Sequence, residues 1–173
     1  MNAEKLLKHM AWANQAIYRQ IAKLPDSALD AYAVNPNWHV REIVRHIWSS
    51  ATWYGYGLLD KNSLSESDEK AWQEKLKETQ THPQKTSDVL AIAEKLVIAD
   101  AVLFESALVP EAMIARKTAD GIVMRARSTL ISQAVHHATE HRAQIVSALE
   151  AKGFTTINLD DYDLWAYSST IGE

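Results

Sequence analysis

The sequence VHHATEHRAQIVSAL, residues 135–149, predicts an amphipathic helix with two histidines on its apolar face. Positions three and four residues apart share one face of a helix, and here that face carries Leu130, Ala134, His137, His141, Ile145 and Ala148. Such a face points into a core, where imidazole nitrogens need partners. The two histidines therefore either bond carbonyl or carboxylate groups inside the core or bind a metal ion.

A third histidine lies on the core face of an earlier predicted helix, which runs from about residue 37 to residue 59. The apolar positions of that helix are Val40, Ile43, Val44, Ile47, Ala51 and Tyr54, and His46 falls within their stripe. Three neutral imidazoles on two facing helices leave coordination positions open to water, as in a catalytic metal site rather than a closed structural one. We therefore predict a divalent metal site at His46, His137 and His141.

Four long amphipathic helices are predicted in all, over residues 2–24, 37–59, 87–107 and 128–152, and they indicate an all-α four-helix bundle. The polar segment 60–84 predicts a long crossover with a short surface helix, which allows the second and third long helices to run parallel. Residues 113–127 contain Asp120-Gly121 between alternating segments and predict a small β-hairpin before the last long helix. The C-terminal tail is expected to pack across one end of the bundle.

Capping residues predict where the helices begin and end. The expected N-terminal caps are Asn35 or Asn37 for the second long helix, Thr86 or Ser87 for the third and Ser128 for the fourth. Gly153 follows a lysine at the end of the fourth helix, in the place where glycine commonly ends a helix.

The composition limits the classes of function. The chain has 173 residues with no shift in composition, so we expect a single domain over residues 1–173. A net charge of −4 without a cluster of basic residues argues against a nucleic-acid partner, and no apolar run reaches the length of a membrane span. The absence of cysteine and of a secretory signal favours a cytoplasmic location, with histidine and oxygen as the available metal ligands.

Several motifs together resemble those of the DinB/YfiT-like superfamily of metalloenzymes. The strongest is HxxxHRxQ, formed by His137, His141, Arg142 and Gln144, and His46 within RHIWSS also matches. The resemblance extends to the opening HMAWANQAIY, to the glycine of AKG and to the aspartate-rich tail, so it covers nearly the whole chain. One departure is the alanine between the arginine and the glutamine, where glycine is common.

The resemblance implies an up-down-down-up four-helix bundle with a metal site at His46, His137 and His141. Members of the superfamily include thiol-dependent S-transferases, isomerases and hydrolases, so we expect a metal-dependent hydrolase or thiol transferase. Its expected partners are a small-molecule substrate or a low-molecular-weight thiol, and a homodimer is a further expectation. The nitrogen ligands suit zinc or nickel, with iron(II) as a third candidate. The alternative is a non-catalytic metal-binding or stress-response protein.

Glu140 is the candidate catalytic residue outside the ligand set. Residues 137–141 spell H-x-x-E-H, the inverted zinc-peptidase motif in which the glutamate acts as a base. Those peptidases are much larger chains with a further glutamate ligand downstream, so the motif alone does not assign the role. Glu140 is either a base near the metal or an ordinary surface carboxylate.

Other polar and aromatic residues have two interpretations each. Arg142 and Gln144 either bond carboxylates of the tail or orient a ligand imidazole. The aromatic residues that either line a pocket near the histidines or belong to the core are Trp12, Trp48, Trp53 and Tyr54. The histidines expected to be surface or capping residues are His9, His39, His82 and His136.

Overall fold

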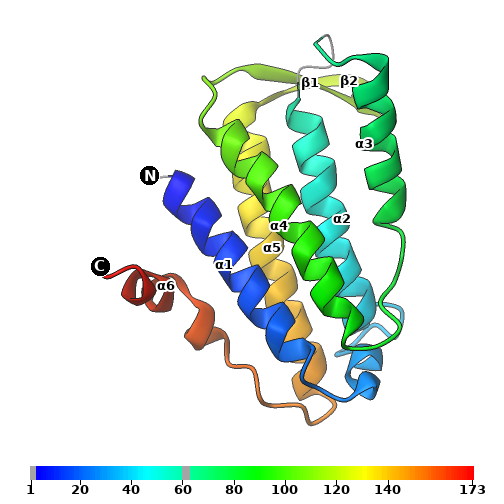
Figure 1. The fold of residues 1–173 in the computed structure, drawn as a ribbon, viewed down its shortest axis with the longest axis vertical. Helices are drawn as coiled ribbons and strands as arrows, with labels where there is room; N and C mark the ends of the chain where they lie inside the picture. Colours follow the sequence, from blue (N-terminus) through cyan, green and yellow to red (C-terminus); the bar gives the residue numbers. More distant parts are fainter. Residues whose placement is uncertain (1–2, 60–62) are drawn as a thin grey trace.

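The computed structural model describes residues 3–59 and 63–173, and in them the chain forms a bundle of four long helices (Figure 1). The long helices are α1 (Ala3–Ile21), α2 (Val40–Leu58), α4 (Asp88–Ala107) and α5 (Arg127–Glu150). The shorter elements are the 3-10 turn η1 (Asp26–Asp30), helix α3 (Glu66–Glu78), strands β1 (Met113–Thr118) and β2 (Gly121–Ala126), the 3-10 turn η2 (Leu159–Tyr162) and helix α6 (Leu164–Thr170). The predicted start of the first helix at residue 2 and of the crossover at residues 60–62 lies outside the described residues.

The directions of the helices confirm the predicted bundle topology. Helices α2 and α4 run parallel to each other and antiparallel to α1 and α5, which is the up-down-down-up order (Figure 1). Both α1 and α2 pack against α4 and α5. The crossover returns along the outer side of α2 as helix α3, so that α4 can start at the same end of the bundle as α2 (Figure 1). This topology places α2 beside α5, which is the contact that a three-histidine site requires.

The apolar stripes of the four long helices meet in one core. Its fully buried side chains include Leu7 and Ile17 of α1, Ile43 and Ile47 of α2, Leu96 and Leu103 of α4, and Ile145 and Leu149 of α5. Burial of each such side chain contributes about 1.5–3 kcal/mol. Tyr18 brings a polar atom into this core, and its hydroxyl donates a hydrogen bond of 2.7 Å to the carbonyl of Val44. The apolar residues that recur with helical spacing in the sequence are therefore the residues buried in the core.

The predicted start of α2 is wrong because a turn, and not an asparagine cap, precedes the helix. Asn35 accepts a hydrogen bond of 3.0 Å from the N–H of Asn37, and its carbonyl accepts one of 2.9 Å from the N–H of Trp38. These two bonds close a turn around Pro36. Helix α2 then begins at Val40, with His39 in the capping position.

The other two predicted helix starts differ from the structure in smaller ways. Ser87 occupies the capping position of α4, but its side chain makes no capping hydrogen bond. The carboxylate of Asp88 accepts the N–H groups of the loop before the helix instead, each at 2.9 Å. Helix α5 begins at Arg127, so Ser128 lies inside it, and the N–H of Ser128 donates to the carboxylate of Glu111 at 3.2 Å. At α5 a nearby carboxylate therefore replaces the serine hydroxyl as the acceptor, whereas at α4 the first-turn N–H groups of Val89 and Leu90 donate to the carbonyls of Thr86 and Ser87 at 3.1 and 3.2 Å.

The end of α5 confirms the predicted glycine stop. Gly153 has a φ of +85°, in the left-handed region that favours glycine. Its N–H donates to the carbonyl of Glu150 at 2.9 Å, and the N–H of Phe154 reaches back to the carbonyl of Leu149 at 3.0 Å. These two bonds form the Schellman motif, which satisfies carbonyls that the helix end leaves without partners.

The tail packs along the side of α1 and not across an end of the bundle, so that expectation is wrong (Figure 1). The ring of Trp12 lies 6.1 Å from the ring of Tyr162 and 5.5 Å from that of Tyr167. His9 Nε2 lies 2.9 Å from the carbonyl oxygen of Tyr162. The tail follows α1 because these two α1 side chains stand on the face that the other long helices leave uncovered.

The predicted β-hairpin is present, but its two turn residues are Ala119 and Asp120, and Gly121 is the first residue of β2. Strands β1 and β2 pair antiparallel from Met113 opposite Ala126 to Thr118 opposite Gly121, and Gly121 has a φ of +120°. The hairpin lies over the end of the bundle at which α2 and α4 end and α5 begins (Figure 1). Among the described residues, every helix is too short or too polar to cross a membrane.

Candidate metal centre

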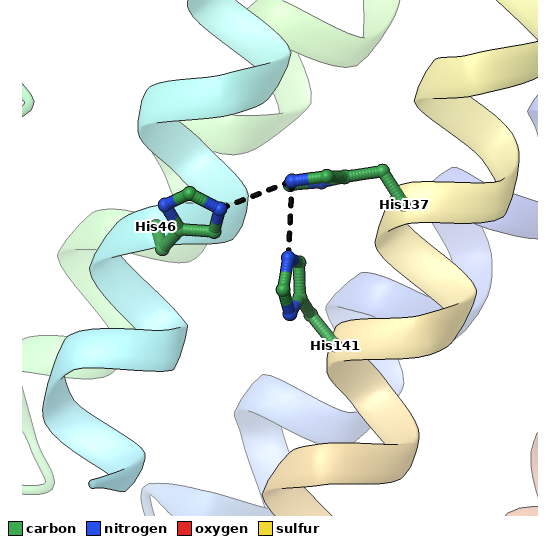
Figure 2. A group of neighbouring side chains, drawn as sticks. All are labelled: His46, His137 and His141. Atoms are coloured by element: carbon green, nitrogen blue, oxygen red, sulfur yellow. Dashed lines mark hydrogen bonds between the residues drawn. The ribbon is translucent and has the colours of Figure 1, made fainter. Parts of the chain in front are cut away.

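Helices α2 and α5 bring the three predicted histidines together (Figure 2). His137 Nε2 lies 3.0 Å from His46 Nε2 and 3.0 Å from His141 Nε2. The candidate ligand atoms of all three residues lie within 4.8 Å of one another. His137 and His141 are one helical turn apart on α5, so both rings reach the same side of that helix, and His46 meets them from α2.

A hydrogen-bond chain fixes the orientation of the His141 ring. Gln144 Oε1 accepts a hydrogen bond of 2.7 Å from the indole N–H of Trp38, which can only donate. The same oxygen lies 2.8 Å from His141 Nδ1, so Nδ1 carries the proton and donates to it. The lone pair of His141 is therefore on Nε2, which faces the other two histidines. An outer partner of this kind is typical of metal-binding histidines.

The geometry and the chemistry of the donor set fit a metal ion. Two nitrogens that are each about 2.0–2.1 Å from one ion stand about 2.9 Å apart at a right angle and about 3.3 Å apart at a tetrahedral angle. The two Nε2 separations of 3.0 Å fall in this range. Without a cation, His137 Nε2 has a single proton to share between two neighbouring nitrogens. A cation at the centre uses all three lone pairs.

The electrostatic surroundings keep two of the imidazoles neutral at neutral pH. Burial, together with the neighbouring His141 and His46, lowers the pKa of His137 to about 4. Burial also lowers the pKa of His46, with His141 and Arg45 adding to the effect. Neutral imidazole is the form that binds a metal, so these two residues release no proton when an ion binds at neutral pH.

An open cavity of about 410 Å³ lies on one side of the histidines. His46 and His137 form part of its wall, with Ser50, Trp53 and Tyr54 of α2 beside them. Ser50 Oγ lies 3.4 Å from His46 Nε2, and the Tyr54 ring stands edge-on to the His137 ring at 5.8 Å. Trp38 covers His46 from another direction, with ring centroids 5.1 Å apart. The centre is thus closed by aromatic residues on one side and open to a small molecule on another.

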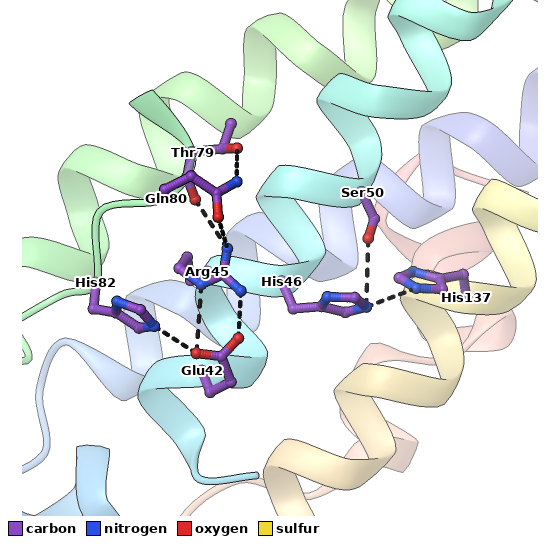
Figure 3. Close-up of polar contacts among 8 residues, drawn as sticks. All are labelled: Glu42, Arg45, His46, Ser50, Thr79, Gln80, His82 and His137. Carbon is purple, nitrogen blue, oxygen red and sulfur yellow. Dashed lines mark hydrogen bonds and ion pairs between the residues drawn. The ribbon is translucent and has the colours of Figure 1, made fainter. Parts of the chain in front are cut away.

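Another part of the wall of this cavity comes from the end of α3 and the loop after it, and Arg45 of α2 binds to this part (Figure 3). Its guanidinium pairs with Glu42 on the same helix. It also donates to the carbonyl of Thr79 at 3.2 Å and to Gln80 Oε1 at 3.4 Å. Glu42 in turn pairs with His82. Thr79 and Gln80 line the cavity, so Arg45 fixes the position of that wall relative to His46, the next residue on α2.

A second polar cluster lies deeper in the bundle, between α1, α4 and α5. Asp100, Asn14 and Arg142 are 4%, 1% and 3% exposed. Arg142 donates to Asn14 Oδ1 at 2.8 Å and to Thr139 Oγ1 at 3.0 Å, and Asn14 Nδ2 donates to Asp100 Oδ2 at 3.3 Å. We call Asn14, Asp100 and Arg142 the buried network. It lies close to the metal centre, because one cavity of about 10 Å³, the size of a water molecule, touches Asn14, Asp100 and His137.

The buried network carries two shifted pKa values. Burial raises the pKa of Asp100 to about 7. Burial lowers the pKa of Arg142 to about 10, although the Asp100 carboxylate opposes the shift. Asp100 Oδ1 has no hydrogen-bond partner among the described residues, which explains why burial outweighs the help of Asn14. Arg142 therefore stays charged at neutral pH, while Asp100 is close to its midpoint.

The remaining predicted residues fall into three groups. Gln144 orients a ligand imidazole, whereas Arg142 belongs to the buried network, and neither bonds a carboxylate of the tail among the described residues. Trp53 and Tyr54 line the cavity beside the histidines, while Trp48 and Trp12 pack elsewhere in the bundle. The histidines outside the cluster are His9 on the tail contact, His39 at the start of α2, His82 beside Glu42 and His136 on the exposed side of α5.

Glu140 lies apart from the cluster of three histidines. It is exposed and lines a separate hollow with Trp38 and Gln144. That hollow does not include His46 or His137. Its role as a base stays a prediction, and the carboxylate occupies the surface position that the alternative interpretation assigns to it.

Several residues around the site were not predicted from the sequence. Asp100 lies on the α4 stripe between Leu96 and Leu103, and Asn14 follows Met10 by four residues on the α1 stripe, so the rule that found the histidines could have found them. Trp38 lies in the turn before α2 and has no periodic signal. Its place above the histidines depends on the turn at Asn35.

The fold and the three convergent imidazoles define a four-helix-bundle protein with a candidate metal centre between two antiparallel helices. The model of the DinB family matches residues 1–170, so the chain belongs to the DinB family. No curated protein and no solved structure matches the chain.

Proposed function

We propose that the protein is a metal-dependent enzyme in which His46, His137 and His141 hold one divalent ion, zinc or nickel before iron(II). The observation that carries the proposal is the convergence of three imidazole nitrogens beside an open cavity of about 410 Å³. Three protein ligands leave part of the coordination shell free, and a structural site would close it. Among the described residues, no carboxylate joins the three histidines as a fourth ligand.

The reaction that this arrangement favours is hydrolysis or the transfer of a thiol to a small substrate. An ion held by the three histidines would lower the pKa of a water or thiol and polarise a substrate carbonyl. Gln144 and Trp38 hold the His141 ring in the orientation that binding needs. Ser50 lines the cavity beside His46 and offers a hydroxyl group to a substrate there.

Metal analysis of the purified protein tests the first half of the proposal. We expect about one ion per chain in the wild type and none in His46→Ala or His137→Ala. The matched control is His136→Ala, which removes the exposed neighbour on the same helix and should keep the ion. A wild-type protein that binds no stoichiometric zinc, nickel or iron(II) would overturn the proposal.

Two assays then separate the enzymatic reactions. One follows conjugation of a low-molecular-weight thiol to an electrophile, and the other follows hydrolysis of simple esters and amides. Activity in either assay that disappears in His137→Ala and persists in His136→Ala supports the enzyme. A metal-loaded protein that is inactive in both favours the alternative, a metal-binding or stress-response protein.

A further inference from the structure

Arg116, on β1, is a partly buried cation without a carboxylate partner among the described residues. Its guanidinium carbon lies 3.8 Å from the centroid of the Trp53 ring, so the two planar groups are in contact. Within the described parts of the chain it forms neither an ion pair nor a hydrogen bond. Burial lowers the pKa of Arg116, and the interaction with Tyr54 opposes the shift. A cation that loses water in this way is costly unless an anion or a π-face compensates.

The surroundings of Arg116 make room for its guanidinium. A Cβ added at Gly57 of α2 would stand 2.9 Å from Arg116 Nη1, so the missing side chain lets the guanidinium lie against the helix. Glycine costs about 1 kcal/mol relative to alanine within a helix, and Gly57 lies within α2. On the opposite strand, Val123 pairs with Arg116, and Arg125 lies two residues further along on the same face of the hairpin.

Arg116 lines a second cavity that is next to the metal centre. This cavity measures about 300 Å³, and its wall includes Arg125, Thr129 and Gln133. Trp53 and Tyr54 form part of its wall and also part of the wall of the histidine cavity. Gln133 precedes His137 by one helical turn and Trp53 follows His46 by two, which corresponds to roughly 6–10 Å along the helices. One small molecule can therefore occupy both cavities.

We propose that Arg116 binds the anionic group, a carboxylate or a phosphate, of the small substrate whose reacting end lies at the three histidines. Only the placement of the reacting end at the histidines rests on the proposed function; the anion site at Arg116 does not depend on it. The guanidinium contacts the Trp53 ring through its central carbon, and its N–H groups have no partner among the described residues, so they are available for a bidentate contact with an oxyanion. Thr129 and Gln133 provide further donors, and the indole and phenol rings of Trp53 and Tyr54 form an apolar wall for the middle of the ligand.

The experiment measures the binding of matched probes to the purified full chain by isothermal titration calorimetry. The anionic probes are phenylacetate and phenyl phosphate, which distinguish a carboxylate from a phosphate. The neutral probe is phenylacetamide, which has nearly the shape of phenylacetate. Each titration is done on zinc-loaded protein and on protein stripped of metal and freed of chelator, so that binding to the metal is separated from binding to Arg116.

The variants are Arg116→Met and Gly57→Ala, with Arg19→Met as the matched control. Arg19 is exposed on α1, so its loss removes the same charge away from the cavity. Gly57→Ala keeps the charge of Arg116 but displaces the guanidinium, and it favours the helix, so the variant should fold. We expect one anionic probe to bind wild-type protein about tenfold or more tightly than phenylacetamide, and Arg116→Met to lose that advantage.

The outcomes separate the two proposals. The anion site is supported, even if no metal binds, when two conditions are met. The metal-free wild type and Arg19→Met bind an anionic probe, and Arg116→Met and Gly57→Ala bind it several-fold or more weakly. Equal binding of phenylacetate, phenyl phosphate and phenylacetamide by the wild type overturns it. Unchanged anion affinity in Arg116→Met also overturns it, and Gly57→Ala decides the question if Arg116→Met does not fold.

Discussion

The metal centre and the buried network are two polar clusters in one bundle, and they satisfy their polar groups in opposite ways. In the buried network donors meet acceptors, since Arg142 donates to Asn14 and Asn14 donates to Asp100, although Asp100 Oδ1 lacks a partner among the described residues. In the metal centre three groups of the same kind, the Nε2 atoms of three histidines, face one another. The network lies inside the core, whereas the centre opens to a cavity.

This difference is the one expected between a structural polar cluster and a binding site. Complementary groups that pair with one another need no ligand, and their loss should reduce stability. Like groups that converge on one point lack a partner within the chain, and a cation is the partner that uses all their lone pairs. The loss of one histidine should therefore reduce metal binding more than it reduces the stability of the metal-free protein.

The largest expected effect is the loss of stability when the buried network is broken. Arg142→Met should lower the free energy of unfolding by about 3–5 kcal/mol, because it leaves Asn14 and Asp100 without the cation that they face. Urea unfolding of the metal-free protein measures this, with Arg19→Met as the control for removal of an exposed arginine. The folded fraction of Arg142→Met should still bind zinc. Loss of zinc binding without loss of stability would place Arg142 in the metal centre and contradict the distinction between the two clusters.

An intermediate effect is expected from the residue that orients His141. Gln144→Leu removes the acceptor of both His141 Nδ1 and Trp38 Nε1. Zinc affinity should fall about 10–100-fold, as is typical when the outer partner of a metal-binding histidine is lost. Competition with a chromophoric chelator measures the affinity. The control is Ser147→Ala, a change at an exposed residue one turn further along α5, which should bind zinc like the wild type. If Gln144→Leu also had the wild-type zinc affinity, the hydrogen bond from His141 to Gln144 would not be needed for metal binding.

A further expected effect, spread over several pH units, concerns Asp100. Its pKa is raised from 3.8 to about 7 in the folded chain, so the folded chain holds the proton more tightly than the unfolded chain does. Its contribution to stability is therefore fully present below about pH 4 and is lost as the pH rises to 7, with a slope of at most about 1.4 kcal/mol per pH unit.

Urea unfolding of metal-free protein between pH 5 and pH 8 measures this contribution. The wild type should lose stability relative to Asp100→Asn as the pH rises to 7, and the difference should become constant above that. Parallel profiles for the two proteins would show that the Asp100 carboxyl does not titrate with a raised pKa.

Helical periodicity made much of the fold and the cluster of three histidines predictable from sequence. The spacing of His137 and His141 on a core stripe, and of His46 on another, depends only on the geometry of each helix. Asp100 and Asn14 follow the same spacing on the stripes of α4 and α1, so their burial was predictable in the same way. The helix starts were less predictable, because a turn at Asn35, the backbone carbonyls before α4 and the carboxylate of Glu111 took the places expected for capping side chains.

The sequence by itself determined the four amphipathic helices, the hairpin, the glycine stop at Gly153 and the faces that carry the histidines, because each follows from contacts between residues close in the chain. The tertiary structure decided which faces meet. It brought His46 to His137 across 91 positions of sequence and Trp38 to Gln144 across 106, and it stacked Arg116 on Trp53. These contacts join side chains of different elements, so they depend on how the helices and the hairpin pack, which no local spacing specifies.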